Sequence, residues 1–584
     1  MPTEPTPTPR EDEFDVTSVH VPMRDGVRLA VSILTPPGRS QARGDGGARW
    51  PAIIVFTRYG RAMKPAVLAA PFSESLAFVR HGFTVVQVDV RGTGASFGHR
   101  KVEKGRIEIE DYREIFDWAA AEPWCDGRLL STGVSYLGNA AEASLVHDHP
   151  ALVAVAPRFT DFDIYEHLLA PGGMPNISFA TAWSAITATL DKGAPADVDA
   201  VPANAVDGDD GTLYRAAVAE HADNADLAKR FAEIVYRGEG SAAATGGDRA
   251  VNLCEAARDL ERGARPAFHW GSWMDAGTAA GLIARFHSLD APQRVKIGAW
   301  THGAMQAADP FHEGEPLAPT RQQQVDEIAR FFNDCLAGTP PLPRKSIEYV
   351  TMGSGVWSQT DVWPPRSVAS ARLYLAPGNS LADTAPTNAE AADTYTVDPT
   401  ATTGRLNRWT TQVGTDIHYG DRAPADARLL TYTAAPLAAP ITLTGTPLVT
   451  LHVASSHADG NFIAYLEAVA PDGLVVYLTE GGLRALHRGP SSTPPLYVRP
   501  GPPRSFRRAD GAPLPIGTFV DLCFPLLPLS ARIPAGYALR LALSGADEDI
   551  FADVTHGEAP RWRVARSIAR ASFIDLPVDH NPVE

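Results

Sequence analysis

The prediction of the fold starts from one stretch, residues 129–138, which read Leu129-Leu130-Ser131-Thr132-Gly133-Val134-Ser135-Tyr136-Leu137-Gly138. The apolar and small residues up to Val134 predict a strand that is covered on both faces. Asn139 to His147 is typical of a helix, and the glycines permit a tight turn between the two elements. Such a turn lifts a serine above the sheet edge, so Ser135 is a candidate nucleophile. The usual pattern is G-x-S-x-G, and Leu137 stands where the second glycine would fall, so the motif alone also fits an ordinary strand-to-helix turn.

Similar apolar runs lie on either side of this stretch, and helical patterns separate them. The runs are Ile53–Thr57, Thr84–Val90 and Leu152–Ala156, and apolar residues recur at helical spacing between residues 109 and 119. Strands that alternate with crossover helices build a mostly parallel sheet. The fold class predicted for this part is therefore α/β.

The chain of 584 residues is too long for a single core, and its texture changes along its length. We predict a first part of an α/β-hydrolase domain at 1–160, an inserted helical cap at 161–265, and the second part of the α/β-hydrolase domain at 266–345. After residue 346 many short strand-like runs follow one another without helices, which predicts an all-β jelly-roll domain at 346–584.

The composition of the chain indicates which binding partners and which cellular compartment to expect. The net charge of −16 disfavours nucleic acid and anionic membranes. No segment is apolar over the length that a membrane span needs. Met1 to Phe14 is rich in proline, threonine and acids and predicts a loose arm, not a secretory signal. The four cysteines are far apart and predict neither disulfides nor a zinc site, so we expect a cytoplasmic protein.

Two further residues follow predicted strands in the way Ser135 does. Asp275 comes directly after the strand-like run Phe268–Met274, and His302 comes directly after Val295–Trp300. The chain order serine, acid, histidine is the order that α/β-hydrolases use, and the carboxyl ends of parallel strands share one rim. These positions predict a catalytic triad of Ser135, Asp275 and His302. Asp309 and His312 are weaker rivals, because neither follows a strand directly.

The sequence also resembles a known family. Three sets of residues around the predicted triad resemble the CocE/NonD hydrolases, a group with cocaine esterases, α-amino acid ester hydrolases and X-Pro dipeptidyl peptidases of the S15 type. The segments that carry the resemblance are Gly133–Gly138, Trp270–Asp275 and Trp300–Gly303, together with Met23–Leu29, Asp89–Ser96 and Trp357–Pro365. The resemblance extends from about residue 17 to the end of the chain.

The resemblance implies a catalytic apparatus. It implies the triad of Ser135, Asp275 and His302, in an elbow that lacks the second glycine at its usual place. It also implies an oxyanion hole made of the hydroxyl of Tyr59, which follows the strand Ile53–Thr57, and the backbone N–H of Tyr136. No metal or cofactor is needed for this chemistry.

Aromatic residues near the predicted site suggest an apolar substrate pocket, formed by Phe179 and Trp183 of the cap and by Trp270, Trp273 and Trp300 beside the acid and the histidine. The alternative is that most of them pack the core. Three carboxylates at the start of the cap offer a site for a free α-amino group, or they are ordinary surface acids: Asp161, Asp163 and Glu166. Arg91 and Asp89 are predicted to form a structural pair near the rim.

The leading hypothesis is a serine hydrolase that cleaves carboxylic esters of small acyl compounds through an acyl-enzyme. The alternative on the same triad is an acylase or an X-Pro or α-aminoacyl peptidase. A third hypothesis is a non-catalytic carbohydrate-binding protein, because jelly rolls often bind sugars. The substrate is then a small ester or amide, and whether the chain forms a homo-oligomer stays open.

Overall fold

The computed structural model describes residues 14–36, 49–61, 71–193, 205–239, 250–339, 344–491 and 493–581. Apart from Phe14, the predicted N-terminal arm lies outside these residues.

The first domain is built on a ten-stranded sheet with the strand order β1-β2-β4-β3-β5-β6-β7-β8-β9-β10. The strands from β4 to β9 run parallel, while β1, β2 and β10 pair antiparallel with their neighbours. Their bounds are β1 Asp15–Pro22, β2 Arg28–Thr35, β3 Trp50–Thr57, β4 Thr84–Asp89, β5 Cys125–Val134, β6 Leu152–Arg158, β7 Ala267–Ser272, β8 Gln293–Gly298, β9 Lys345–Thr351 and β10 Val356–Thr360. Strands β9 and β10 extend this sheet past the domain boundary predicted near residue 345.

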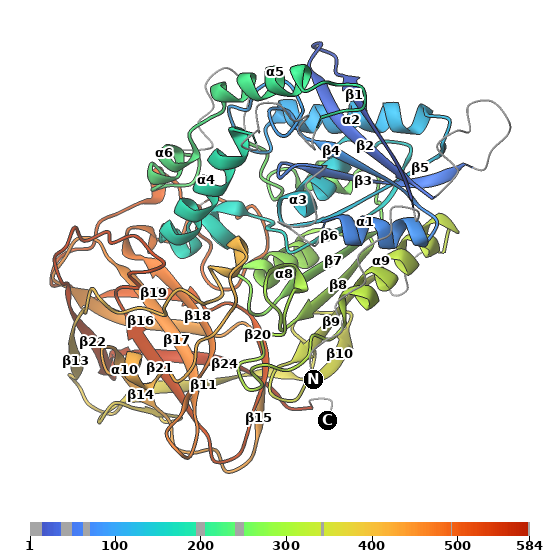
Figure 1. The fold of residues 1–584 in the computed structure, drawn as a ribbon. Coiled ribbons are helices and arrows are strands. Elements are labelled where there is room, and N and C mark those ends of the chain that lie inside the picture. Colours follow the sequence, from blue (N-terminus) through green and yellow to red (C-terminus); the bar gives the residue numbers. More distant parts are fainter. Residues whose placement is uncertain are drawn as a thin grey trace.

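Helices cover both faces of the first sheet (Figure 1). They are α1 Pro71–Arg80, α2 Arg106–Ala121, α3 Tyr136–Ala143, α8 Thr278–Ser288 and α9 Arg321–Leu336. Strand β3 shows the packing: Ile54 and Phe56 enter the core on one face, and Ile53 and Val55 enter the core on the other. Burial on both faces explains why this strand reads as a continuous apolar run. The predicted α/β fold class is confirmed.

The segment between β6 and β7 contributes short helices. They are α4 Ile177–Asp191, α5 Thr212–Glu220, α6 Leu227–Ala232 and α7 Ala257–Glu261, preceded by the turns η3 Tyr165–Leu169 and η4 Pro171–Gly173. Asn176 caps α4 by accepting a hydrogen bond from the N–H of Phe179, and Asp226 caps α6 in the same way from Lys229. In Figure 1, α4, α5 and α6 lie along one side of the first domain.

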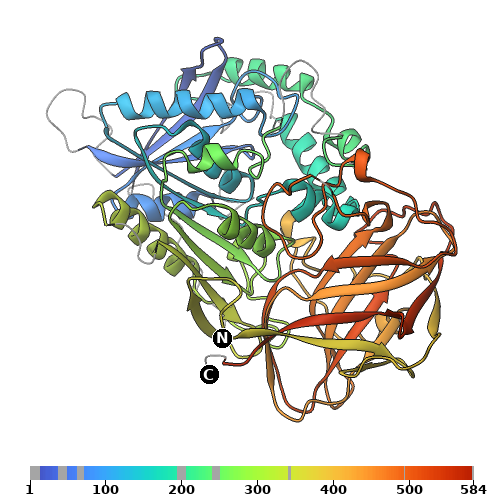
Figure 2. The same ribbon diagram turned by 180° about the vertical axis from the view of Figure 1, so that it is seen from behind.

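The second domain is all-β and packs beside the first, as Figure 2 shows from behind. Its strands pair antiparallel apart from the short parallel contact of β12 with β14. The strands are β11 Val368–Ala376, β12 Ser380–Ala382, β13 Ala392–Thr396, β14 Leu430–Thr433, β15 Ile441–Gly445, β16 Leu448–Ser455, β17 Asn461–Val469, β18 Val475–Arg484, β19 Val520–Pro525, β20 Leu529–Ile533, β21 Ala538–Ser544, β22 Arg561–Ser567, β23 Arg570–Ala571 and β24 Phe573–Asp579. A short helix, α10 Ala423–Asp426, precedes β14. The jelly-roll connectivity itself stays a prediction.

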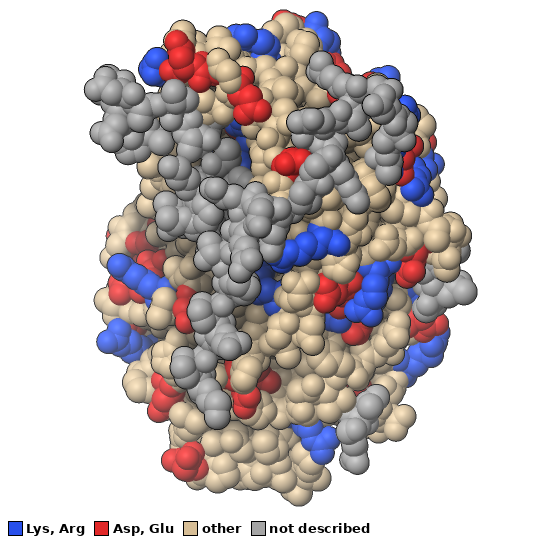
Figure 3. All heavy atoms as spheres, turned by 45° about the vertical axis from the view of Figure 1, so that its right-hand side comes forward, with Lys and Arg blue, Asp and Glu red and all other residues tan. Residues whose placement is uncertain are grey.

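The surface carries charges of both signs side by side. On the face in Figure 3, the coloured acidic and basic side chains are interspersed and form no large patch of one sign. Among the described helices, none has the length and apolar character needed to cross a membrane.

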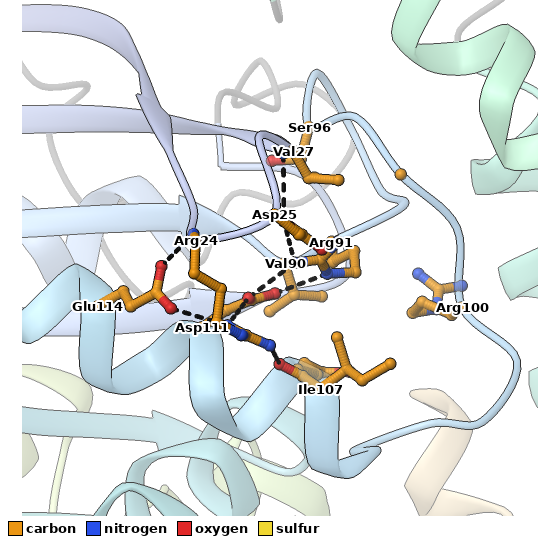
Figure 4. A network of polar contacts seen from close by, with 12 residues as sticks. Arg24, Asp25, Val27, Val90, Arg91, Ser96, Arg100, Ile107, Asp111 and Glu114 are labelled. Atoms are coloured by element: carbon orange, nitrogen blue, oxygen red, sulfur yellow. Dashed lines mark hydrogen bonds and ion pairs between the residues drawn. The ribbon is translucent and has the colours of Figure 1, made fainter. Parts of the chain in front are cut away.

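The predicted pair of Arg91 and Asp89 is wrong. Arg91 instead binds Asp111 with two nitrogens at 2.8 Å and Asp25 at 2.8 Å, in a network that joins the β1–β2 turn to α2 (Figure 4). Asp89 is fully buried and pairs with Arg61 at 2.9 Å. Arg91 lies beyond the end of β4, and the Asp89 carboxylate is already occupied by the backbone N–H groups of Arg61 and Ala95, so the two residues take different partners.

Candidate active site

Ser135 lies in a strained turn between β5 and α3. Its backbone has φ 61° and ψ −126°, a region that non-glycine residues rarely adopt, and such strain is common at functional sites. The turn needs glycine at two places. A Cβ on Gly133 would lie 2.3 Å from the Cβ of Leu137, and a Cβ on Gly138 would lie 2.7 Å from the carbonyl oxygen of Arg158 on β6. The close approach to the sheet therefore occurs at Gly138, which explains why Leu137 fits at the position where the usual motif has glycine.

Asp275 and His302 form a hydrogen-bonded pair at the ends of two neighbouring strands. Asp275 follows β7 and is completely buried, and His302 follows β8. The Nδ1 atom of His302 donates to the Oδ2 atom of Asp275 at 2.9 Å. This contact orients the imidazole ring and leaves its other nitrogen free to face a substrate.

The histidine segment packs directly on the elbow. A Cβ on Gly303 would lie 3.2 Å from a methyl group of Val134, the residue before Ser135. The Nε2 atom of His302 is buried and has no hydrogen-bond partner among the described residues. An unpartnered buried nitrogen next to the elbow is what a general base for Ser135 requires.

Within the described chain, the rival residues Asp309 and His312 form no hydrogen bond with Ser135, Asp275 or His302. His312 is exposed, and its Nδ1 atom lies 3.4 Å from Asp309. Asp309 also accepts a hydrogen bond from the backbone N–H of Gly353 at 2.8 Å, so its role is to hold a loop.

Two residues of the all-β domain donate hydrogen bonds to Asp275, the candidate acid of the triad. Thr411 donates to the Oδ1 atom of Asp275 at 2.6 Å, and the side-chain nitrogen of Gln412 donates to the same oxygen at 2.9 Å. The Gln412 nitrogen also lies 3.0 Å from the Nδ1 atom of His302. Sequence reasoning missed both residues, because they lie more than a hundred positions away and follow no strand of the first sheet.

Replacing Gln412 by alanine is expected to lower kcat roughly 10- to 100-fold, because a loosened acid misplaces the imidazole ring. KM is expected to change less than kcat, although Gln412 also lines the pocket above Ser135. The measurement is steady-state hydrolysis of a p-nitrophenyl ester. Gln322→Ala, on the exposed face of α9, is the matched control. Equal activity of the two variants would show that Gln412 does not position the pair.

Tyr59 and Tyr136 lie on either side of the serine. Tyr59 follows β3, and its hydroxyl accepts a hydrogen bond from the indole N–H of Trp183 at 3.1 Å. Burial raises the pKa of Tyr59, while hydrogen bonds with Trp183 and Ser135 work in the opposite direction. The hydroxyl therefore keeps its proton at neutral pH and can donate it to an anion. Tyr136 opens α3 directly after the serine, so its backbone N–H is unpaired within the helix.

A buried glutamate lies beneath Tyr136. The Oε1 atom of Glu108 on α2 accepts hydrogen bonds from the hydroxyls of Tyr112 and Tyr136, and its Oε2 atom has no partner among the described residues. Burial raises the pKa of Glu108 to about 7, with the nearby charge of Glu103 contributing in the same direction. Glu108 therefore anchors the first turn of α3 from below.

The raised pKa of Glu108 predicts a pH-dependent stability. The unfolded carboxyl titrates near its ordinary value of 4.5 and the folded one near 7, so the folded state holds the proton more tightly. The contribution of this group to the free energy of unfolding is full below the lower value and is lost as the pH rises to the higher one. Glu108→Gln abolishes this titration. Urea unfolding from about pH 5 to about pH 8 should show the variant gaining stability relative to the parent chain. A constant difference across this range would contradict the prediction.

A pocket of about 310 Å³ opens above Ser135. Phe179 and Trp183 of α4 line it, with their rings stacked at 5.7 Å. Trp270, Trp273 and Trp300 were predicted beside them, and the structure places them elsewhere. Trp270 stacks on Trp300 at 5.6 Å and Trp273 on Trp363 at 5.7 Å, and all are buried in the core. Trp270 lies within β7, Trp273 directly follows it and Trp300 lies just beyond β8, and the side chains of all three fill the core.

The carboxylates at the start of the cap already have partners. Asp163 is buried and binds Arg237 through two hydrogen bonds of 2.6 Å, which hold the pKa of its carboxyl far below the usual range. Glu166 pairs with Arg499 at 2.7 Å. Asp161 lines the pocket above Ser135 and accepts a hydrogen bond from Asn139, with Lys104 at 3.7 Å.

Comparison with known proteins links the chain to serine hydrolases. Residues 25–304 match the model of the X-Pro dipeptidyl-peptidase S15 family, and residues 338–569 match the C-terminal non-catalytic domain of X-Pro dipeptidyl-peptidase. A Mycobacterium tuberculosis protein named "Putative serine esterase" is 35% identical over 98% of this chain and 96% of its own length. Cocaine esterase of Rhodococcus is 28% identical over 82% of this chain and 84% of its own. A solved α-amino acid ester hydrolase superposes with a TM-score of 0.73 at 19% identity, over 99% of this chain and all of the other.

Proposed function

Because the chain belongs to the X-Pro dipeptidyl-peptidase S15 family, we propose that it hydrolyses carboxylic esters of small acyl compounds through an acyl-enzyme on Ser135. The resemblance to CocE/NonD hydrolases that the motifs indicate is confirmed by these matches along nearly the whole chain. The chain is thus a serine hydrolase, and the substrate and the roles of single residues are the proposal.

The observation that carries the proposal is the pairing of Asp275 with His302 next to the strained turn of Ser135. The hydrogen bond of 2.9 Å fixes the ring, and the free Nε2 atom is the one that can accept the serine proton. In the proposed mechanism, His302 takes this proton as the Ser135 oxygen attacks the acyl carbon. Asp275 keeps the imidazole in the correct tautomer and stabilises its charged form. The protonated His302 then gives the proton to the leaving alcohol, and water releases the acid by the reverse path.

The oxyanion of the tetrahedral intermediate is proposed to lie between the Tyr59 hydroxyl and the Tyr136 N–H. A donor of this kind contributes about 3 to 4 kcal/mol to the transition state. Trp183 supports the geometry, because its indole N–H occupies one lone pair of the Tyr59 oxygen and so directs the hydroxyl proton elsewhere.

The charges around the pocket favour an acyl group without a free α-amino group. Besides Asp161, the pocket is lined by Glu103, which pairs with Arg58 at 3.1 Å, by Glu239, which pairs with Arg508 at 2.6 Å, and by the exposed Glu255. A carboxylate with a cationic partner gains little from a second cation. Phe179 and Trp183 give the same pocket an apolar wall that suits an aliphatic or aromatic acyl group.

A matched pair of substrates tests this preference. The p-nitrophenyl esters of phenylacetic acid and of phenylglycine differ in the α-amino group alone. We expect kcat/KM to be roughly tenfold or more higher for the phenylacetyl ester, because the pocket carboxylates of Asp161, Glu103 and Glu239 already interact with cations. X-Pro p-nitroanilides should be hydrolysed more slowly than either ester. A clear preference for the phenylglycyl ester or for an X-Pro anilide would favour the aminoacyl or peptidase alternative.

We also propose that the enzyme is cytoplasmic. The four cysteines support this location, because all of them are free thiols and two are buried. Secreted proteins more often pair their cysteines in disulfides.

A further inference from the structure

Two adjoining cavities lie where the cap and α8 meet the all-β domain. One has a volume of about 450 Å³ and is mostly apolar, with walls from Met174, Ile283, Trp409, Phe506 and Phe551. The other has a volume of about 290 Å³ and is lined by four arginines, Arg237, Arg499, Arg504 and Arg507. Glu166, Tyr497, Arg499 and Arg504 line both cavities, so an apolar chamber and a cationic chamber share one wall.

The positive charges in this wall exceed the negative ones. Arg237 is neutralised by Asp163, and Arg499 is neutralised by Glu166. Arg504 forms no ion pair with any described carboxylate. It donates to three backbone carbonyls, those of His487 at 2.9 Å, Arg488 at 3.3 Å and Cys523 at 2.6 Å, and its Nη1 atom has no partner within the described chain.

Burial raises the free energy of the unpaired positive charge on Arg504. Arg504 is only 6% exposed, and burial together with the neighbouring Arg499 lowers the pKa of its guanidinium to about 10. A cation that is removed from water is stabilised most by an anion with which it can form charge-assisted hydrogen bonds. Arg507 also lines the cationic cavity, but it is exposed and interacts electrostatically with Asp510.

We infer that the two cavities form a binding site for an amphipathic organic carboxylate, separate from the Ser135 pocket. The carboxylate would lie in the cationic cavity beside Arg504 and Arg507, and the hydrocarbon part would fill the apolar cavity between Trp409 and Ile283. Ser135, Tyr59 and Tyr136 do not line the apolar cavity. The cationic cavity does touch the Ser135 pocket, because Arg237 and Arg507 line both. The site is therefore a neighbour of the catalytic pocket, with its own charge and its own chamber.

Calorimetric titration with decanoate tests the inference. The enzyme is first blocked at its serine with a fluorophosphonate, so that binding in the catalytic pocket is obstructed. We expect one decanoate per chain, with much weaker binding of decanol and of inorganic phosphate. Loss of decanoate binding on blocking the serine would overturn the inference, and so would phosphate binding as tight as that of decanoate.

Variants then locate the site. Arg504→Gln is expected to weaken decanoate binding roughly 10- to 100-fold, through loss of a charged hydrogen-bond donor. The control Arg405→Gln removes an arginine that is 87% exposed and lines neither cavity, and it should leave binding unchanged. Because Arg504→Gln also removes bonds to three carbonyls, Ala280→Phe provides a second test that fills the apolar cavity and leaves every arginine in place. Unchanged decanoate binding in Ala280→Phe would contradict the site.

Discussion

Replacing Ser135 by alanine is expected to lower kcat for p-nitrophenyl esters by about 10⁴-fold or more, because the acyl-enzyme can no longer form. A residual rate above that of water is expected from the oxyanion donors and from substrate binding. The measurement is steady-state hydrolysis of p-nitrophenyl butyrate with the parent enzyme and the variant at equal concentration.

The control for this prediction is a serine within β5, the strand that leads to Ser135. Ser131 is buried and donates to the carbonyl oxygen of Ile54, so Ser131→Ala perturbs β5 without touching the proposed chemistry. We expect this variant to keep nearly all of its kcat and to lose some stability. If Ser135→Ala retained the activity of Ser131→Ala, the proposed nucleophile would be wrong.

The second large effect is expected for Asp275→Asn, with a loss of roughly 10⁴-fold in kcat. Asparagine can offer an N–H to His302 in place of an acceptor, which favours the tautomer whose Nε2 atom carries a proton and cannot act as a base. Substrate binding should be almost unaffected, because Asp275 is completely buried behind the histidine.

Asp309→Asn is the matched control for this change. Asp309 also lies near a histidine that comes after β8, yet this partner, His312, is exposed and forms no hydrogen bond with Ser135 or Asp275 within the described chain. The Asp309→Asn variant should therefore keep a kcat within a few-fold of that of the parent enzyme. Comparable losses in the two variants would mean that general disturbance of the loops after β8, and not the orientation of His302, sets the rate.

The parts of the site that could be predicted from sequence are those fixed by the parallel sheet. Ser135, Asp275 and His302 each follow a strand whose apolar run is visible in the sequence, and the carboxyl ends of such strands meet at one rim. Tyr59 follows β3 by the same rule, and the family resemblance suggested its role. Strand ends are local features, so a single sequence is enough to find them.

The parts that could not be predicted depend on contacts between distant segments. Thr411 and Gln412 of the all-β domain form hydrogen bonds with Asp275. No pattern in the sequence indicates which loop of that domain contacts the α/β domain. The tryptophans show the opposite difficulty. Trp270 and Trp300 are close to the catalytic candidates in sequence, but burial on both faces of the sheet turns their rings into the core. Sequence proximity to a site does not determine on which side of a strand a residue lies.

Mass spectrometry of the enzyme after reaction with a fluorophosphonate identifies the nucleophile itself. We expect one adduct per chain, located on the peptide that contains Ser135, with loss of esterase activity in proportion to labelling and no adduct in Ser135→Ala. An adduct on a different residue, or full activity in the labelled enzyme, would contradict this expectation.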